Sequence, residues 1–176
     1  MEWWQKAAEQ GLARAQCNLG VMYEYGTGVA RSYEKAAEWY LKAAEQGDAL
    51  AQCNLGVMYE NGRGVEQSDE KAVEWFKKAA EQGFADAQYD LGDMYYYGRG
   101  VEQSDEKAVE WVLKAAEQGY ARAQWNLGLM YECGTGIEQS CEKAAEWVQK
   151  AAEQGLASAQ YDLGDMYYYG RGVEQS

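Results

Sequence analysis

Leu19-Gly20-Val21-Met22-Tyr23 is the stretch that decides the fold, because it returns along the chain at a fixed interval. The Leu-Gly pair, followed one residue later by Met-Tyr, recurs at Leu55, Leu91, Leu127 and Leu163, each 36 residues after the last. All 20 glycines keep the same period. A period of this size is typical of a repeat array, in which each unit is stable only when it stacks on its neighbours. Such arrays usually serve as binding surfaces.

Each unit is expected to form two helices, as the stretch from residue 47 to residue 82 illustrates. Residues 48–61 carry apolar side chains at i, i+4, i+7 and i+8, the spacing of one helix face. Gly62-Arg63-Gly64 ends this first helix. Ser68 and Asp69 offer side-chain oxygens that can cap a second helix, which continues to about the end of the unit. The sequence therefore predicts an all-α fold built from helix pairs.

Two positions within the unit lead to predictions about packing. Gly56 lies inside a helix, where glycine costs about 1 kcal/mol relative to alanine. We expect its missing side chain to let the neighbouring helix come close. A tryptophan on each second helix is expected to anchor the core, because burying its ring removes a large apolar area from water. These tryptophans are Trp3, Trp39, Trp75, Trp111 and Trp147.

The strings AQ-x-x-LG-x-MY-x-x-G-x-GV and EKA-x-EW-x-x-KAAEQG closely resemble the Sel-one-like repeat (SLR), a relative of the tetratricopeptide repeat. The resemblance covers the whole chain. It implies an α/α solenoid of stacked antiparallel helix pairs that form a right-handed superhelix, with the first helix of each pair on the concave side. It also implies an adaptor that assembles other proteins and carries no shared catalytic residues.

On this reading residues 1–176 form a single repeat domain. Its complete units start near residues 11, 47, 83 and 119. A second-type helix at residues 1–10 precedes them and a first-type helix near residues 156–169 follows them, each without its pair. Because the two unmatched faces are complementary, we expect copies of the chain to stack head to tail. Such a heterologous contact could propagate into filaments.

One side of the first helix is the candidate binding surface. When the units are superimposed, the varying positions occupy a single arc of roughly 120°, at about 100° per residue, and the resemblance places this arc in the concave groove. In the C-terminal half it carries aromatic residues, which are enriched at interface hot spots, interleaved with carboxylates. The alternative is that these tyrosines merely pack on adjacent units. The candidate partner-binding residues are Tyr89, Asp93, Tyr96, Tyr97, Trp125, Leu129, Glu132, Tyr161, Asp165, Tyr168 and Tyr169.

Charge and composition narrow the classes of partner. The net charge is −13 and histidine is absent. An acidic chain repels nucleic-acid phosphates and anionic membrane surfaces, so we expect a protein or peptide partner of basic or amphipathic character. The simpler alternative is that the charge only keeps an extended rod soluble. Without histidine there is no Ser-His or Cys-His nucleophile pair and the usual zinc-ligand sets are poorly served, so no enzyme, cofactor or metal site is expected.

The four cysteines fall into two pairs. Cys17 and Cys53 occupy equivalent positions of adjacent units, and packed helices lie about 8–10 Å apart, beyond the reach of a disulfide. We expect both to be free thiols. Cys133 and Cys141 flank the loop between two helices, a spacing that resembles the bridge within each unit of cysteine-rich secreted bacterial SLR proteins. They are a candidate disulfide, although no other unit of this chain carries the pair.

Three functions follow from these observations. The leading one is a non-catalytic scaffold that holds a peptide or protein in the concave groove. The unmatched terminal helices favour instead a self-assembling natural or engineered array with no partner beyond itself, and the Cys133/Cys141 pair hints at a secreted or periplasmic bacterial effector-type binding protein. Residues 1–10 lack an apolar signal core. We therefore expect a cytoplasmic protein, or a periplasmic or secreted one if the chain is a truncated fragment.

Overall fold

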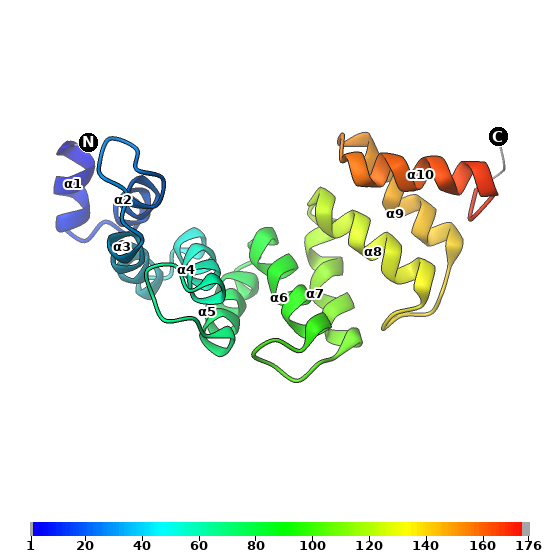
Figure 1. The fold of residues 1–176 in the computed structure, drawn as a ribbon, viewed down its shortest axis with the longest axis horizontal. Helices are drawn as coiled ribbons and strands as arrows, with labels where there is room; N and C mark the ends of the chain where they lie inside the picture. Colours follow the sequence, from blue (N-terminus) through cyan, green and yellow to red (C-terminus); the bar gives the residue numbers. More distant parts are fainter. Residues whose placement is uncertain (1, 174–176) are drawn as a thin grey trace. The chain divides into compact units, whose positions relative to one another are not determined.

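The computed structural model describes residues 2–173, which form helices joined by short loops (Figure 1). This part of the chain contains ten α-helices and no strand, as the all-α prediction requires. None of these helices is long and apolar enough to cross a membrane. They are α1 (Glu2–Glu9), α2 (Ala13–Tyr25), α3 (Tyr33–Glu45), α4 (Ala49–Asn61), α5 (Asp69–Glu81), α6 (Ala85–Tyr97), α7 (Asp105–Glu117), α8 (Ala121–Cys133), α9 (Cys141–Glu153) and α10 (Ala157–Tyr169).

The helix ends lie where the capping residues predict them. At the start of α4, the Asp48 carboxylate accepts a hydrogen bond from the backbone N–H of Ala51 at 2.8 Å. That helix ends at Gly62, whose φ of 64° is the left-handed conformation that glycine adopts easily. The hydroxyl of Ser68 caps α5 by accepting from the backbone N–H of Lys71 at 3.3 Å. The predicted bounds of both helices are confirmed to within a residue.

The helices belong to two compact units. The first contains residues up to Ala87 together with Arg99–Val101, and the second contains Gln88–Gly98 and the chain from Glu102 onward. In the first unit, each helix from α1 to α4 packs on the helix that follows it. In the second, α6 meets α7 at Gly92, and each helix from α7 to α9 packs on the next. The predicted stacking of adjacent helices is therefore present in both units.

A glycine in the first helices α2, α4, α6 and α8 lets the second helix of the pair approach closely. A Cβ on Gly56 would lie only 2.7 Å from Cδ1 of Phe76. Gly20 faces Tyr40 in the same way. The pairs Gly92/Val112 and Gly128/Val148 repeat the contact in the second unit, at 2.7 Å and 2.6 Å. The predicted packing role of the mid-helix glycine is confirmed at these four positions.

The prediction that the tryptophans anchor the core is wrong. In α3, α5, α7 and α9 the fully buried side chain is the one that follows the tryptophan, such as Phe76 after Trp75. Trp75 itself is half-buried and packs against the edge of the core, while the ammonium of Lys78 lies 3.9 Å from its ring centroid. Trp3 is 77% exposed. The physical reason is that the tryptophan stands at the margin of the apolar face, where its ring covers the core and stacks under a lysine.

Buried glutamines link three consecutive helices in both compact units. The side-chain amide of Gln52, in α4, donates to the carbonyl of Ala44 in α3 at 3.0 Å. Its oxygen accepts from the side chain of Gln82, just after α5, at 2.7 Å. Gln16 and Gln124 make the same two bonds in their own surroundings. Each of these buried amides is thus satisfied by groups from the helices on either side.

Candidate partner-binding site

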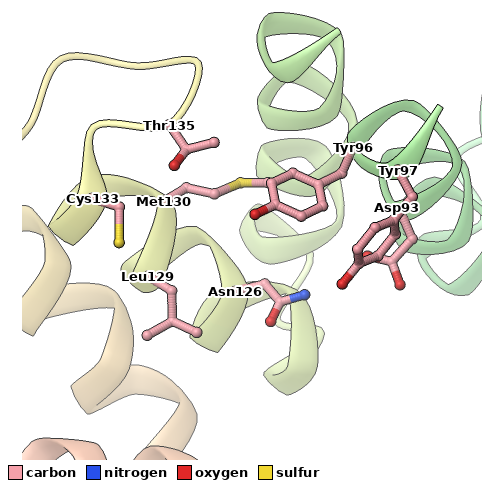
Figure 2. Close-up of a pocket in the computed structure, with 8 residues that line it drawn as sticks. All are labelled: Asp93, Tyr96, Tyr97, Asn126, Leu129, Met130, Cys133 and Thr135. Carbon is pink, nitrogen blue, oxygen red and sulfur yellow. The ribbon is translucent and has the colours of Figure 1, made fainter. Parts of the chain in front are cut away.

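A hollow between α6 and α8, in the second unit, is the candidate site. Its volume is about 300 Å³. Figure 2 shows side chains of α6 and α8 on its two sides, with Thr135 of the loop after α8 at one end. We call this hollow the α6–α8 pocket. It is lined by Asp93, Tyr96, Tyr97, Asn126, Leu129, Met130, Cys133 and Thr135.

Helical spacing explains why these side chains meet. Asp93, Tyr96 and Tyr97 stand at i, i+3 and i+4 of α6 and so share one face. The lining residues of α8 follow the same rule, from Asn126 to Cys133. The opposite face of α6 is fixed in the core by Leu91 and Met94, each at most 1% exposed. Burial of one face therefore holds the other toward the pocket.

The pocket combines aromatic rings with a single charge. The rings of Tyr96 and Tyr97 meet edge to face, with centroids 4.8 Å apart, and Tyr97 is 63% exposed. Asp93 is the one charged residue in the lining, which contains no lysine or arginine. Leu129 and Met130 supply an apolar wall. Such a surface offers ring faces, apolar contact and a carboxylate to a bound group.

Tyr89, a predicted partner contact, lies behind this surface instead of on it. It is only 5% exposed, and its ring centroid is 5.5 Å from that of Tyr120. Its hydroxyl accepts a hydrogen bond from the side-chain amide of Asn126 at 2.9 Å. Burial, together with the negative charge of Asp93, raises the pKa of Tyr89 above its ordinary value. The prediction is corrected: Tyr89 packs α6 against its neighbours and holds Asn126 in place.

Trp125 and Glu132, also predicted to contact a partner, form bonds within the second unit. The indole N–H of Trp125, in α8, donates to the carboxylate of Asp162 in α10 at 2.7 Å. The Glu132 carboxylate accepts from the guanidinium of Arg171, in the loop after α10. Both side chains therefore join successive repeats. Of the candidate residues on α8, only Leu129 lines the pocket.

The remaining candidates form a separate surface on α10. Tyr161 and Tyr168 are 70% and 68% exposed, and Tyr169 is 64% exposed. The rings of Tyr168 and Tyr169 meet edge to face at 4.9 Å, as their counterparts on α6 do. Asp165 is half-buried on the same helix. None of these four residues lines the α6–α8 pocket, so the predicted stripe consists of two separate parts.

Four lining residues were not among the candidates for binding: Asn126, Met130, Cys133 and Thr135. Thr135 carries a sequence signal that could have been used. It stands at the centre of Gly-Thr-Gly, as Thr27 does in the loop after α2, whereas the loops after α4, α6 and α10 have Gly-Arg-Gly. The pocket thus lies beside a loop whose central residue is a threonine and not the longer arginine.

All four cysteines are free thiols in the structure. Cys17 and Cys53 are buried, Cys141 is half-buried and Cys133 is exposed at the pocket. The candidate disulfide between Cys133 and Cys141 is not formed. Burial, and then the nearby charge of Asp48, raise the pKa of the Cys17 thiol from 9.0 to about 12. Within residues 2–173 no group of three or more cysteine, aspartate or glutamate side chains is arranged to hold a metal ion.

Comparison with known families and structures agrees with the repeat pattern. The Sel1 repeat family matches the chain throughout, over residues 1–12, 13–48, 49–84, 85–120, 121–156 and 157–176. A search among curated proteins finds no match.

Three solved structures are similar to this chain. One is a protective antigen of uropathogenic Escherichia coli that displays an SLR fold, with 45% identity and a TM-score of 0.96 over 100% of this chain. Another is a Sel1 repeat protein from Oxalobacter formigenes, with 39% identity and a TM-score of 0.89 over 95%. The third is an immunity protein from Pseudomonas aeruginosa, with 29% identity and a TM-score of 0.62 over 94%. The chain spans 38%, 66% and 61% of these proteins respectively.

Proposed function

This chain belongs to the Sel1 repeat family, whose members are generally non-catalytic protein-interaction scaffolds, and we propose that it binds a protein or peptide on the exposed faces of its first helices. The observation that carries the proposal is the α6–α8 pocket. It gathers two tyrosine rings, a carboxylate and an apolar wall from two successive first helices. Aromatic side chains in a hollow are the usual anchors of a protein interface.

The charge of the chain supports a basic or amphipathic partner. The net charge of −13 attracts positively charged surfaces and steers their approach. Asp93 places one negative charge inside the pocket, and Leu129 and Met130 offer contact to apolar groups. A peptide that carries both kinds of side chain suits this lining.

Two tyrosine pairs provide a matched test of the binding surface. Tyr96/Tyr97 and Tyr168/Tyr169 occupy the same positions of their repeats and have the same edge-to-face geometry, but only the first pair lines the pocket. The immobilised wild type and the two double serine variants would be compared for proteins captured from the source lysate. We expect a protein retained by the wild type and the α10 variant and lost by the α6 variant. Equal capture by all three would place binding elsewhere, and no capture would contradict the proposed function.

Self-association is a second candidate, favoured by one observation on α10. Nothing lies within 4 Å of a Cβ built on Gly164, whereas Tyr40 covers the equivalent Gly20. The residue of α1 that corresponds to Tyr40 is Trp4, which is 49% exposed. Trp4 of a second copy could therefore cover Gly164. Sedimentation of the wild type and a Trp4→Ser variant over a range of concentrations tests this, and identical monomeric profiles would exclude it.

A further inference from the structure

In two of the described loops, an arginine forms an ion pair with a glutamate of the preceding first helix. In the first unit, the guanidinium of Arg99 donates to the Glu60 carboxylate at 2.6 Å. In the second, Arg171 makes the equivalent ion pair with Glu132. Each arginine is the middle residue of a Gly-Arg-Gly loop, and each glutamate stands at the same position near the end of its helix. We call this contact the loop bridge.

The α6–α8 pocket lies where the loop bridge is missing. Tyr96 stands at the position of Glu60 and Glu132, and Thr135 stands at the position of the two arginines. Both substituted residues line the pocket, and Figure 2 shows Tyr96 on α6 and Thr135 on the loop after α8. A threonine side chain is too short to cross the distance that an arginine spans. The hollow is therefore the space that the chain's own arginine fills elsewhere.

Glu24 and Arg63 occupy the two bridge positions near the start of the chain, and each has another contact there. The Glu24 carboxylate accepts a hydrogen bond from the hydroxyl of Tyr40 at 2.7 Å, and the guanidinium of Arg63 lies 6.0 Å from the ring centroid of Tyr33. Both bridge positions are thus filled by charged side chains at that junction. The α6–α8 junction differs because neither position carries a charge.

The lining of the pocket suits a guanidinium group. Arginine is planar and weakly hydrated, and it stacks on aromatic faces while it donates several hydrogen bonds. Tyr96 and Tyr97 supply the faces, and Asp93 supplies a negative charge one helical turn away from them. Thr135 and Asn126 carry side-chain oxygens that can accept hydrogen bonds. A volume of about 300 Å³ lies at the lower end of the range for small-molecule sites, which favours a single side chain over a large ligand.

We infer that the α6–α8 pocket binds one arginine side chain of a partner peptide, which takes the place of the missing loop arginine. The inference rests on the proposed function, since it names the group by which the partner is recognised. The partner's guanidinium lies against Tyr96 and Tyr97 and faces the Asp93 carboxylate. Leu129 and Met130 contact the methylene groups of the same arginine.

The pocket is tested directly with a small probe, N-acetyl-arginine amide, added to the full chain and followed by amide chemical shifts. We expect saturable shifts at residues 93–97 and 126–135, and affinity at least about tenfold weaker in the Asp93→Asn variant. N-acetyl-citrulline amide has nearly the same shape without the charge and should bind at least about tenfold more weakly. Equal binding of citrulline, equal binding of N-acetyl-lysine amide, or shifts away from the pocket would overturn the inference.

A second variant refills the pocket with the chain's own side chains. Thr135→Arg combined with Tyr96→Glu restores both residues of the loop bridge seen at Glu132 and Arg171. Unchanged helical circular dichroism would show that this variant folds, and we expect it to lose probe binding. Binding that persists in the refilled variant would show that the probe sits elsewhere.

Partner capture then separates this inference from the proposed function. A captured protein that is released by N-acetyl-arginine amide, and not by the citrulline compound, supports both. A protein captured through Tyr96 and Tyr97 but insensitive to the arginine probe would leave the scaffold function in place and contradict the arginine site. Probe binding without any captured protein would support the pocket chemistry and contradict the scaffold function.

Discussion

Replacing Gly56 by alanine tests the close packing of the helix pairs. The added Cβ would lie 2.7 Å from both Cδ1 and Cε1 of Phe76 and 3.2 Å from its Cγ. Because Phe76 is fully buried, its ring cannot move away without displacing its neighbours. Overpacking of this kind costs about 1–3 kcal/mol, while the better helix propensity of alanine returns about 1 kcal/mol. We therefore expect Gly56→Ala to lower the free energy of unfolding by up to about 2 kcal/mol.

The chain supplies its own control at Gly164, the equivalent position of α10. Nothing lies within 4 Å of a Cβ built there, so only the gain in helix propensity, about 1 kcal/mol, applies. The same substitution should thus destabilise one repeat and stabilise another. Urea unfolding followed by helical circular dichroism measures the first effect. Hydrogen exchange at the α10 amides measures the second, because repeats can open locally.

A double variant separates the steric contact from other effects. Phe76→Ala alone removes a fully buried ring and should cost about 3–5 kcal/mol. In its presence the Cβ of Gly56→Ala no longer meets a ring, so the two changes should cost less together than the sum of their separate costs. If Gly56→Ala and Gly164→Ala change stability by the same amount, or if the double variant is additive, the packing argument is refuted.

Three further predictions concern the cysteines and the buried amides. Burial raises the pKa of the Cys17 thiol from 9.0 to about 12. The resulting stabilisation of the fold is complete below pH 9 and is lost as the pH rises toward 12. Between pH 8 and pH 11 the urea midpoint of Cys17→Ala should therefore fall less than that of the wild type. Iodoacetamide should label exposed Cys133 well before buried Cys17, and mass spectrometry of the peptides checks the order; equal rates would contradict the burial of Cys17. Gln52→Ala removes two side-chain hydrogen bonds, one to the carbonyl of Ala44 and one from the side chain of Gln82. At about 0.5–1.5 kcal/mol each, it should cost about 1–3 kcal/mol of unfolding free energy, and an unchanged urea midpoint would contradict this.

The fold could be predicted from the sequence because the same apolar spacing and capping residues recur in each 36-residue repeat. Apolar spacing and two capping residues fixed α4 and α5 to within a residue. The mid-helix glycine pointed correctly to close packing. The tryptophans were wrongly predicted to anchor the core, since Trp75 and Phe76 are neighbours and periodicity does not decide which of two adjacent apolar residues is more buried. Only the contact between Gly56 and Phe76 decides it.

The site was predicted in part. Asp93, Tyr96, Tyr97 and Leu129 were among the candidates and do line the pocket. Tyr89 was wrongly predicted to lie on the surface. Variation among the repeats shows that a position does not need one particular residue type, but it does not show that the side chain is exposed. Thr135 was missed because the pocket arises from what is absent: a shorter side chain in the loop leaves space. Comparison of the Gly-x-Gly loops would have singled out Thr27 and Thr135 together, whereas the meeting of α6 and α8 required coordinates.

The glutamine contacts have a mechanical consequence. Each of Gln16, Gln52 and Gln124 bonds to a group in the helix before its own and to the glutamine that directly follows the helix after its own. A pulling force applied to the two ends of the chain therefore loads these bonds in series, and one can break while the next still holds. Extension should proceed in steps, and each released 36-residue unit adds about 12 nm of contour length. Such a chain would yield gradually under tension and re-form unit by unit when the tension falls.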